Sequence, residues 1–451
     1  MVFGIWVLGF DYDLLVTLDA ALEPNLSASQ PRRPLSVALL GFGTVGASVA
    51  RILTERPELA DRVRLTHVYN RNVGRKRADW VTGSVTWTDQ LDEVFASSPD
   101  VVVEVMGGVD AAYTVVTRAL RQRASVVTAN KMLLARHGPE LLGLAAENHA
   151  LLRFEAAVGG GVPLIHGVRE GLAGDNLTRV VGILNGTCNY ILSRMFETDE
   201  SLDVVLADAQ RLGYAEADPT ADVDGHDAAA KLVVLSGIAF RRFLRLDEIP
   251  KHSIRPISSA DFRYARRLGC TIRQLSQVEA TEDGFYACVG PALVPINSSF
   301  GRNEGANNVV SIFGRYGGES AFSGAGAGGP ATAVAVVSDL LALTGRERNR
   351  GIEKWEPAGL ASPPTRAYYV RFVVHDQPGI LAAIAASLAR QHVNVDALLQ
   401  EPGFPKDRLP FVITVEPCEE TALRSAISEI SSAEWHAEAP LALPMLSGAH
   451  S

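Results

Sequence analysis

Short apolar runs alternate with helix-like stretches between residues 35 and 157. The helix-like stretches include Ala111–Gln122 and Glu140–Asn148. The apolar runs are Val37–Leu40, Val63–Tyr69, Val101–Val105, Val126–Thr128 and Leu151–Ala156. Strands that alternate with helices are typical of a parallel sheet covered on both faces. The pattern therefore predicts an α/β fold that begins with a doubly wound sheet.

The pattern becomes longer and less regular after Val158. Strand-like runs and helical stretches are mixed there, which predicts an α+β domain. They are Pro163–Leu172, Ser201–Leu212, Asp227–Phe240, Gln277–Val278, Ala287–Val289, Val309–Phe313 and Ala331–Leu343. From Tyr368 onward the order is strand, helix, strand, strand, helix and strand, which predicts a separate small domain.

These changes divide the chain into five segments. The charged stretch before the last domain carries Pro and Gly, as does a linker, and Gln30–Pro34 has a similar composition. We expect an N-terminal extension without a catalytic role at residues 1–34, a first domain at 35–157, a second at 158–343, a linker at 344–366 and a third domain at 367–442.

The composition excludes several classes of protein. The chain has 451 residues, 47% of them hydrophobic, which suffices for two or three buried cores. Its net charge of −9 argues against a nucleic-acid partner. The four cysteines lie far apart, so we expect reduced thiols rather than disulfides or a zinc site. The apolar stretch Val2–Leu18 carries aspartates and no basic flank, so we expect no signal peptide, no membrane span and a cytoplasmic protein.

A glycine-rich loop follows the first predicted strand. In a G-x-G-x-x-G loop the first glycine permits a tight turn, the second lets the backbone approach a pyrophosphate, and the third lets helix and sheet pack closely. Between a strand and a helix of a doubly wound pattern, the motif predicts a Rossmann-type dinucleotide site rather than an ordinary turn. Its residues are Gly41, Phe42, Gly43, Thr44, Val45 and Gly46.

The end of the second strand bears on the choice of cofactor. Asn70 and Arg71 stand where an NAD site usually carries Asp or Glu, and more basic residues follow. Arg71 is suited to the 2′-phosphate of NADP(H), which we therefore expect to be preferred over NAD(H). A solvated basic turn, with NAD(H) as cofactor, is the alternative.

A second polar cluster lies between Gly213 and Lys231. Asp227 and Lys231 share one face of a predicted helix, which Asp224 is placed to cap. A simple surface ion pair is one interpretation. Because Lys231 lies among apolar residues and near several carboxylates, a proton donor with an adjustable pKa is the other. A calcium loop is excluded, since Lys231 stands where such a loop requires Glu.

The block from Glu216 to Lys231 resembles the signature of the homoserine dehydrogenase family. Three more segments agree with that family: Thr128–Lys131, Glu155–Pro163 and Asn185–Leu192. The resemblance covers residues 35 to 440 and implies a Rossmann-type domain, an α+β substrate and dimerisation domain, and a ferredoxin-like ACT domain. It also implies NAD(P)H-dependent, reversible reduction of L-aspartate 4-semialdehyde to L-homoserine, in the biosynthesis of threonine, methionine and isoleucine.

The resemblance assigns roles to these polar residues. Lys231 would transfer the proton, and Lys131 would be a second lysine in the same cleft, also touching the cofactor. Glu216 and Asp227 would bind the ammonium group of the substrate, which needs negative partners, and Asp222 would support them.

The resemblance also extends the cofactor site and implies a metal ion. Gly107 and Gly328 would contact the cofactor, although a plain hinge would also explain the late glycine run. A monovalent cation, sodium or potassium, would be held by backbone carbonyls, which suit a hard ion. The carbonyls are those of Glu155, Val158, Gly160 and Val162.

The Asp376–Ile380 turn resembles the strand–helix junction of an ACT domain, which binds amino acids at interfaces between copies. The resemblance implies L-threonine as the effector, and a homodimer or homotetramer; a helix N-terminus suits the effector carboxylate. Val393–Val395 and the insert Pro402–Pro410 depart from the family pattern and would alter effector binding. Because the candidate catalytic residues all precede the linker, we expect the tail to be dispensable for the chemistry.

Two other functions fit part of this pattern. Another ACT-bearing dehydrogenase, of the hydroxy-acid or prephenate type, would explain both ends of the chain but not the Glu216–Lys231 block. A non-catalytic sensor of NADP and an amino acid would keep the glycine loop and the ACT domain, but it would not need Lys231.

Overall fold

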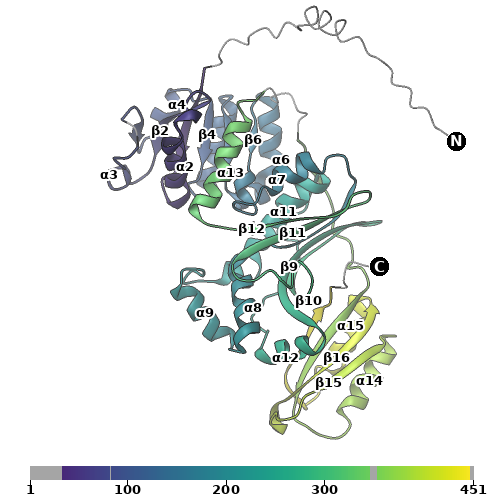
Figure 1. Cartoon of the computed structure of the whole chain (residues 1–451). Coiled ribbons are helices and arrows are strands. Elements are labelled where there is room, and N and C mark those ends of the chain that lie inside the picture. Colours follow the sequence, from purple (N-terminus) through teal and green to yellow (C-terminus); the bar gives the residue numbers. More distant parts are fainter. Residues whose placement is uncertain (1–32, 82, 346–352, 447–451) are drawn as a thin grey trace, which may run out of the picture.

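A computed structural model describes residues 33–81, 83–345 and 353–446. Figure 1 shows the N-terminal sheet and its helices at one end, a second sheet in the middle and the C-terminal module at the other end. The predicted extension at residues 1–34 lies outside the described residues except for its last two. The four cysteines are free thiols, as predicted. None of the described helices is long and apolar enough to cross a membrane.

The N-terminal sheet has six parallel strands in the order β3-β2-β1-β4-β5-β6, which confirms the doubly wound, Rossmann-type prediction. The central strands are buried along most of their length, because helices cover both faces. The strands are β1 (Leu35–Leu40), β2 (Val63–Tyr69), β3 (Thr86–Thr88), β4 (Val101–Glu104), β5 (Ser125–Thr128) and β6 (Leu152–Arg153).

Three details of this domain differ from the predictions. Strand β3 was not predicted, and β6 has only two residues because the 3₁₀ turn Glu155–Ala157 begins soon after it. The last helix begins at Lys131 rather than Glu140, because the Asn130 side chain caps it. The helices are α2 (Thr44–Glu55), α3 (Val73–Lys76), α4 (Leu91–Ala96), α5 (Asp110–Arg121) and α6 (Lys131–Glu147).

The second sheet has the order β10-β9-β7-β11-β12 and is antiparallel, as an α+β domain predicts. The sequence revealed only parts of it, and it missed the helix at Gly186 because Asn-Gly indicates a turn. The strands are β7 (Leu177–Ile183), β9 (Cys270–Thr281), β10 (Gly284–Pro295), β11 (Asn307–Gly314) and β12 (Gly318–Ala325). The helices are α7 (Leu164–His166), α8 (Gly186–Thr198), α9 (Leu202–Arg211), α10 (Thr220–Val223), α11 (His226–Phe240) and α12 (Ser259–Arg267).

Helix α13 (Gly329–Ala342) leaves the second sheet and returns to the first. It packs against α2, and Figure 1 shows the two helices side by side. Its buried residues Val336 and Leu340 belong to the core of the first sheet. The chain therefore crosses between the two sheets after β6 and again after β12.

The described part of the predicted linker is anchored by Trp355. Its indole is buried, and it lies edge-on to Phe154 at 5.8 Å between ring centroids. A Cβ atom added at Gly138 or Gly237 would lie only 2.5 or 2.4 Å from the indole, so both glycines are needed for this packing. The short strand β13 (Glu356–Pro357) then pairs with β8 (Arg242–Phe243). The prediction of a plain linker is therefore wrong for this part.

The C-terminal module is a four-stranded antiparallel sheet in the order β15-β16-β14-β17, with two helices. Its strand, helix, strand, strand, helix, strand order confirms the ferredoxin-like prediction. The elements are β14 (Arg366–Val374), α14 (Ile380–Arg390), β15 (Val395–Gln400), β16 (Leu409–Cys418), α15 (Glu420–Ile430) and β17 (His436–Pro444).

This module shares a hydrophobic core with the second domain. Tyr369 and Val412 of the module belong to one buried cluster with Phe262 of α12. Beside that cluster, the buried side chains of Arg371 and Asp261 form an ion pair. The C-terminal module therefore has a sheet of its own, as a separate small domain predicts, but part of its hydrophobic core is shared with the second domain.

Candidate active site

The glycine loop lies between β1 and α2. A Cβ atom at Gly41, where φ is +106°, would lie 2.5 Å from the Val105 carbonyl oxygen, and one at Gly46 would lie 2.0 Å from the Gly41 oxygen. Packing therefore requires both glycines. At Gly43 no atom of the described part of the chain lies within 4 Å of such a Cβ, and the first turn of α2 carries no acidic residue. The open N-terminus of α2 is suited to an anion.

Two other predicted cofactor residues border open space at the same end of the sheet. Gly328 and Gly107 have φ angles of +116° and +76°, and no atom of the described residues lies within 4 Å of a Cβ added at either. Gly328 lies close to the glycine loop, because a Cβ at the next residue, Gly329, would lie 2.7 Å from Cγ2 of Thr44. Ligands of doubly wound sheets bind at this carboxyl edge of the strands.

The side chains of Phe42 and Arg71 are placed very differently. Phe42 is 5% exposed and packs edge-on against Trp87, so only its backbone is left for a cofactor. Arg71 follows β2, whose last residue, Tyr69, accepts a hydrogen bond from the Gly41 N–H at 3.0 Å. Arg71 is exposed and has no ion-pair partner among the described residues. An exposed guanidinium beside the loop is suited to a phosphate.

Asp227 lies between two lysines. Its Oδ1 is 3.0 Å from Nζ of Lys131, and its Oδ2 is 3.0 Å from Nζ of Lys231. Lys131 opens α6 of the first domain, whereas Lys231 lies on α11 of the second, so this carboxylate joins the two domains. The Lys231 and Asp227 side chains are 12% and 14% exposed, which rules out a simple surface ion pair.

Asn185 connects Asp227 to a second carboxylate. Its Nδ2 donates to Oδ1 of Asp222 at 2.6 Å and to Oδ2 of Asp227 at 3.0 Å. Its Oδ1 accepts from the Cys188 N–H at 2.8 Å, which caps α8 and fixes the amide. The sequence pattern predicts no role for Asn185. The sequence feature that could have identified it is an asparagine directly before the glycine that begins a helix.

The two carboxyl groups differ in their readiness to ionise. Burial raises the pKa of Asp222, against the hydrogen bond from Asn185. Burial also opposes ionisation of Asp227, but the charges and hydrogen bonds of Lys231 and Lys131 together hold its pKa well below the ordinary value. The surroundings therefore favour the ionised form of Asp227 and disfavour that of Asp222.

Two acidic residues of the predicted cluster lie apart from it. Glu216 is in an exposed loop, and its carboxylate forms no hydrogen bond or ion pair with another described side chain, although its backbone carbonyl accepts a hydrogen bond from Gln210 at 3.0 Å. Asp224 does not cap α11, so that prediction is wrong. Gly225, with φ at +81°, occupies the N-cap position, while Asp224 accepts a 2.6 Å hydrogen bond from Ser253.

The segment with the predicted cation ligands links β6 to α7 at the crossing between sheets. Its backbone curls at Gly159 and Gly160, where φ is +81° and +58°. The Val162 carbonyl also accepts a hydrogen bond from the Leu164 N–H at 2.7 Å. The described residues contain no cluster of three or more acidic, His or Cys side chains suited to a metal.

Glu104 and Asn130 support this edge of the sheet and were not predicted. Glu104, at the end of β4, is fully buried and accepts a 2.6 Å hydrogen bond from the Thr128 hydroxyl. Burial raises its pKa. Asn130 caps the helix that carries Lys131, and it donates to the Gly108 carbonyl at 2.6 Å. The sequence feature that could have identified Glu104 is its position as a glutamate at the end of an apolar run.

Fold and site together define a class of protein. The parallel sheet with its glycine loop is typical of a dinucleotide-binding domain, and the two lysines around Asp227 place positive charge at the junction with a second domain. That combination is typical of an oxidoreductase that reduces a carbonyl group.

Comparisons with known proteins agree. The family model described as homoserine dehydrogenase matches residues 163–341, the one for its NAD-binding domain matches 41–155, and the ACT domain model matches 368–434. The chain is 43% identical to homoserine dehydrogenase of Mycobacterium tuberculosis over 386 residues, which is 82% of this chain and 87% of that protein. It therefore belongs to the homoserine dehydrogenase family and ends in an ACT domain.

Two solved structures are also similar. A homoserine dehydrogenase from Thiobacillus denitrificans has a TM-score of 0.85 and 33% identity, covering 92% of this chain and 99% of that chain. A mutant of a hyperthermophilic archaeal homoserine dehydrogenase, in complex with NADPH, has a TM-score of 0.59 and 27% identity, covering 68% of this chain and 97% of that chain.

Proposed function

We propose that the chain catalyses the reversible, NAD(P)H-dependent reduction of L-aspartate 4-semialdehyde to L-homoserine, in the biosynthesis of threonine, methionine and isoleucine. The observation that carries this proposal is the Asp227 carboxylate between Lys131 and Lys231, at the junction of the nucleotide-binding sheet and the second domain. A similar archaeal enzyme was solved with NADPH, which supports a nicotinamide cofactor.

The test is NADPH oxidation with L-aspartate 4-semialdehyde as the substrate. We expect oxidation that depends on both compounds and on the enzyme concentration. A 2-oxo acid with NADH, and prephenate with NAD, are the controls for other ACT-bearing dehydrogenases. A folded protein that binds NADPH but oxidises it with none of these would instead be a sensor. A sensor would not need the cluster of Asp227 with Lys131 and Lys231, so the presence of that cluster favours an enzyme.

Lys231 is suited to protonate the product. A bound nicotinamide nucleotide supplies the hydride to the aldehyde carbon. The aldehyde oxygen then needs a proton and a positive neighbour, and an ammonium group provides both. Lys231 donates to the Leu184 carbonyl at 2.7 Å and to Asp227 at 3.0 Å, so two of its three N–H groups hold Nζ in place and one is left for the substrate. Lys131 adds a second positive charge.

The acidic residues are suited to the substrate's ammonium group. Asp222 and Asp227 are held together by Asn185, which places two carboxylates within reach of one cation. Glu216 lies on the exposed loop before α10, and we propose that its free carboxylate completes this site when the substrate binds.

The cofactor preference depends on Arg71. We expect NADPH to be preferred, and Arg71→Ala to lower the NADPH-to-NADH ratio of kcat/KM at least tenfold, because a guanidinium binds a phosphate dianion much better than it binds a ribose hydroxyl. Arg51→Ala, on the surface of α2, is the matched control, since its partner is Glu55 at 3.5 Å. An unchanged ratio in Arg71→Ala would show that this turn is only a solvated surface.

We also propose that sodium or potassium binds at the Glu155–Val162 segment, through carbonyls of Glu155, Val158, Gly160 and Val162. The two left-handed glycines support this, because they curl the backbone between the donors. Replacing sodium and potassium by choline at constant ionic strength should lower both the activity and the melting temperature. If neither quantity changes, the segment is a plain connection.

The ACT domain supports control by an amino acid, and we propose L-threonine as the effector. We further propose a cytoplasmic homodimer or homotetramer, whose size sedimentation measures directly. The match to ACT domains covers residues 368–434, so the stretch around Asn394 and the 402–410 insert both lie within it.

A further inference from the structure

Glu104, the last residue of β4, is a buried carboxylate that the proposed reaction does not yet use. Its side chain is 0% exposed, and no cationic side chain of the described residues forms an ion pair with it. Burying a carboxylate without a cation is costly unless hydrogen bonds replace the lost water. Glu104 lies at the carboxyl edge of the parallel sheet, where the ligands of such folds bind. A charge kept there at this cost indicates a function.

The groups that surround the Glu104 carboxylate donate hydrogen bonds to it. Its Oε2 accepts from the Thr128 hydroxyl at 2.6 Å, and its Oε1 accepts from the Met106 N–H at 2.9 Å. Hydrogen bonds from the Gly107 N–H and the Asn130 side chain also favour the charged form, against the effect of burial, which raises the pKa of Glu104. The Thr128 oxygen accepts from the Asn130 N–H at 3.0 Å, so its own hydrogen is free for Glu104. Donors at both oxygens are suited to an ionised carboxylate.

The same hydrogen bonds join the loops that follow β4 and β5. Asn130, in the second loop, donates to the Gly108 carbonyl of the first loop at 2.6 Å. Its side chain also caps α6, whose first residue is Lys131. Because Glu104 contacts both loops, its position bears on Gly107, a predicted cofactor contact, and on Lys131.

The order of the strands indicates which end of a dinucleotide would lie over these two loops. In a doubly wound sheet the ligand crosses the carboxyl edge where the strand order reverses, which here is between β1 and β4. Its pyrophosphate would lie at the N-terminus of α2. Arg71, which we expect to contact the adenosine end, follows β2 on one side of that point. The nicotinamide end would therefore extend to the other side, toward β4, β5 and the second domain.

We propose that Glu104 is a positioning residue of the nicotinamide site and that its negative charge favours binding of the oxidised cofactor over the reduced one. The nicotinamide ring carries a positive charge when it is oxidised and none when it is reduced, so a fixed carboxylate nearby stabilises only the oxidised ring. Lys131 and Lys231 bring positive charge to the same junction, and Glu104 offsets their effect. This inference rests on the proposed nicotinamide-dependent function.

The test is to measure the dissociation constants of NADP⁺ and NADPH separately, by calorimetric titration of the full chain. Glu104→Gln keeps the shape of the side chain and removes its charge, so it should weaken the binding of NADP⁺ about tenfold relative to that of NADPH. A unit charge at about 10 Å, with an effective dielectric constant of about 20, has an effect of that size. A ratio of the two constants that stays at the parent's value would overturn the role of the charge.

Two substitutions of Thr128 separate the position of the loops from the charge. Thr128→Val removes the hydroxyl and leaves the Glu104 charge in place, so the ratio of the two dissociation constants should stay at the parent's value. Its kcat should fall, because the loop that leads to Lys131 loses its contact with Glu104. Thr128→Ser keeps the hydroxyl and should match the parent in both quantities. If Thr128→Val changes the ratio as much as Glu104→Gln does, the shape of the loops explains the effect and the charge does not.

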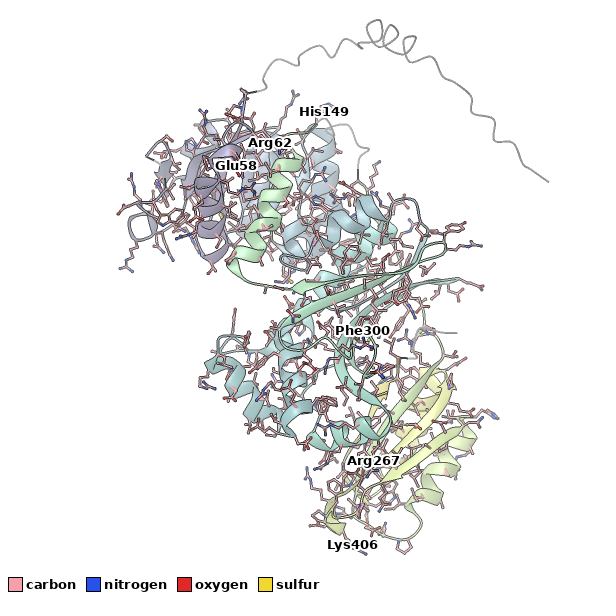
Figure 2. All side chains as sticks on the ribbon, viewed as in Figure 1. Glu58, Arg62, His149, Arg267, Phe300 and Lys406 are labelled. Carbon is pink, nitrogen blue, oxygen red and sulfur yellow. The ribbon has the colours of Figure 1, made fainter. Side chains whose placement is uncertain are left out.

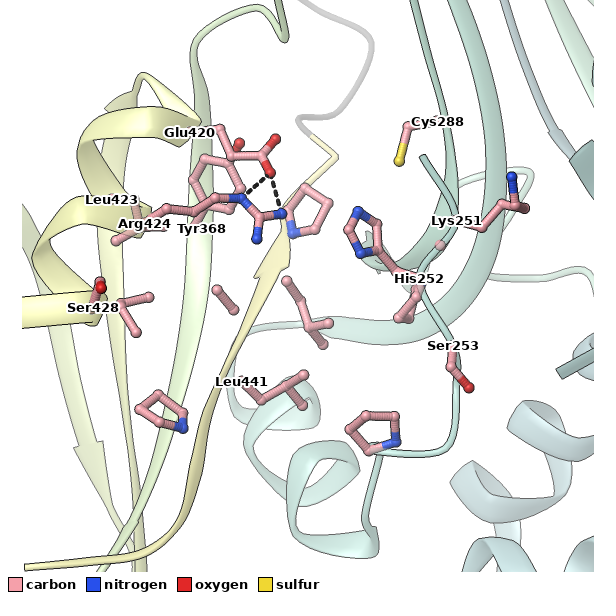
Figure 3. Close-up of a pocket in the computed structure, with 18 of the residues that line it drawn as sticks. Lys251, His252, Ser253, Cys288, Tyr368, Glu420, Leu423, Arg424, Ser428 and Leu441 are labelled. Carbon is pink, nitrogen blue, oxygen red and sulfur yellow. Dashed lines mark hydrogen bonds and ion pairs between the residues drawn. The ribbon is translucent and has the colours of Figure 1, made fainter. Parts of the chain in front are cut away.

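Two other carboxylates control for the loss of a negative charge alone. Glu58 lies on the first domain, as Figure 2 shows, and its side chain is 59% exposed beside Arg56. Glu420 is 22% exposed and pairs with Arg424 on the wall of a cavity of about 510 Å³ between α15 and the second domain, drawn in Figure 3. Glu58→Gln and Glu420→Gln should both keep the parent's ratio. A ratio altered in either control as much as in Glu104→Gln would contradict the assignment.

The dissociation constants do not depend on turnover, so this test is separate from that of the proposed reaction. A changed ratio in Glu104→Gln, together with a parent chain that does not reduce aspartate semialdehyde, would support the role of Glu104 and overturn the proposed reaction. An active parent with an unchanged ratio in Glu104→Gln would do the reverse. If circular dichroism shows that Glu104→Gln does not fold, Glu104→Met replaces it, because methionine has a similar length and no charge.

Discussion

Replacing Lys231 with alanine should lower kcat at least 100-fold, with little change in the affinity for NADPH. A lost proton donor typically costs a factor of about 10² to 10⁴. The variant also loses one of the two positive charges that lie 3.0 Å from Asp227, in a side chain that is only 12% exposed. The nucleotide loop is built by other residues, so a dissociation constant for NADPH from fluorescence titration should stay within about threefold.

The Lys131→Ala variant distinguishes the role of Lys131 from that of Lys231. Lys131 is 35% exposed and forms an ion pair with Asp227, whereas Lys231 is held both by Asp227 and by the Leu184 carbonyl. If Lys231 is the donor, Lys131→Ala should retain a measurable rate with an unchanged pH profile. Lys231→Ala should lose the limb of the profile that reports the proton donor. The reverse result would assign the proton to Lys131.

A surface lysine controls for the loss of charge alone. Lys406 is 86% exposed and lies in the C-terminal module, so Lys406→Ala should keep the parent rate. A Lys231→Ala variant within about threefold of the parent would contradict the assignment. A variant that does not fold is recognised by its circular dichroism spectrum. In that case Lys231→Met, which keeps the aliphatic stem, replaces it in the comparison.

The sequence predicted those parts of the fold that depend on local pattern. Buried parallel strands read as apolar runs, so the first sheet was found almost completely, and the glycine loop located its ligand edge. The tail was found because its strand and helix order is regular. Long antiparallel strands were found only in part, because the polar residues of β9, such as Arg273 and Gln274, are buried and interrupt the apolar pattern.

The sequence could not predict contacts between distant segments. Lys131 meets Asp227 only because two domains close on each other, and no spacing in the chain reveals that pair. Asn185 joins Asp222 to Asp227 for the same reason. Trp355 belongs to a stretch with the composition of a linker, yet glycines on two remote helices make room for it. Such contacts depend on tertiary packing, which the periodicity of one segment does not contain.

The shared core at the C-terminal module is the largest departure from the sequence prediction, and it changes what a truncation should do. Removing the chain after about residue 350 would expose Phe262 and Tyr264, which are fully buried, and would leave the Asp261 carboxylate without Arg371. We therefore expect the shortened chain to aggregate or lose activity, instead of acting as a complete catalytic unit.

Arg371→Leu should lower the free energy of unfolding by about 3 to 5 kcal/mol, the usual cost of breaking a buried ion pair by removing one partner. Asp261 is fully buried, and it also accepts from the Tyr369 hydroxyl at 2.8 Å and from the Ser258 N–H at 2.8 Å. Those two hydrogen bonds remain in the variant, but the buried Asp261 carboxylate loses the Arg371 guanidinium that neutralises it.

Urea unfolding of the full chain measures this cost, and two further variants define its origin. Arg390→Leu breaks a pair whose side chains are 54% and 41% exposed, so it should cost less than about 1 kcal/mol. Arg371→Leu combined with Asp261→Asn removes both charges and should recover part of the loss, because no unpaired charge is left buried. If Arg371→Leu lowers the free energy of unfolding no more than Arg390→Leu does, the ion pair does not hold the module in place, and its apolar contacts do. The effect of the truncation would then depend on how much of Phe262 and Tyr264 becomes exposed.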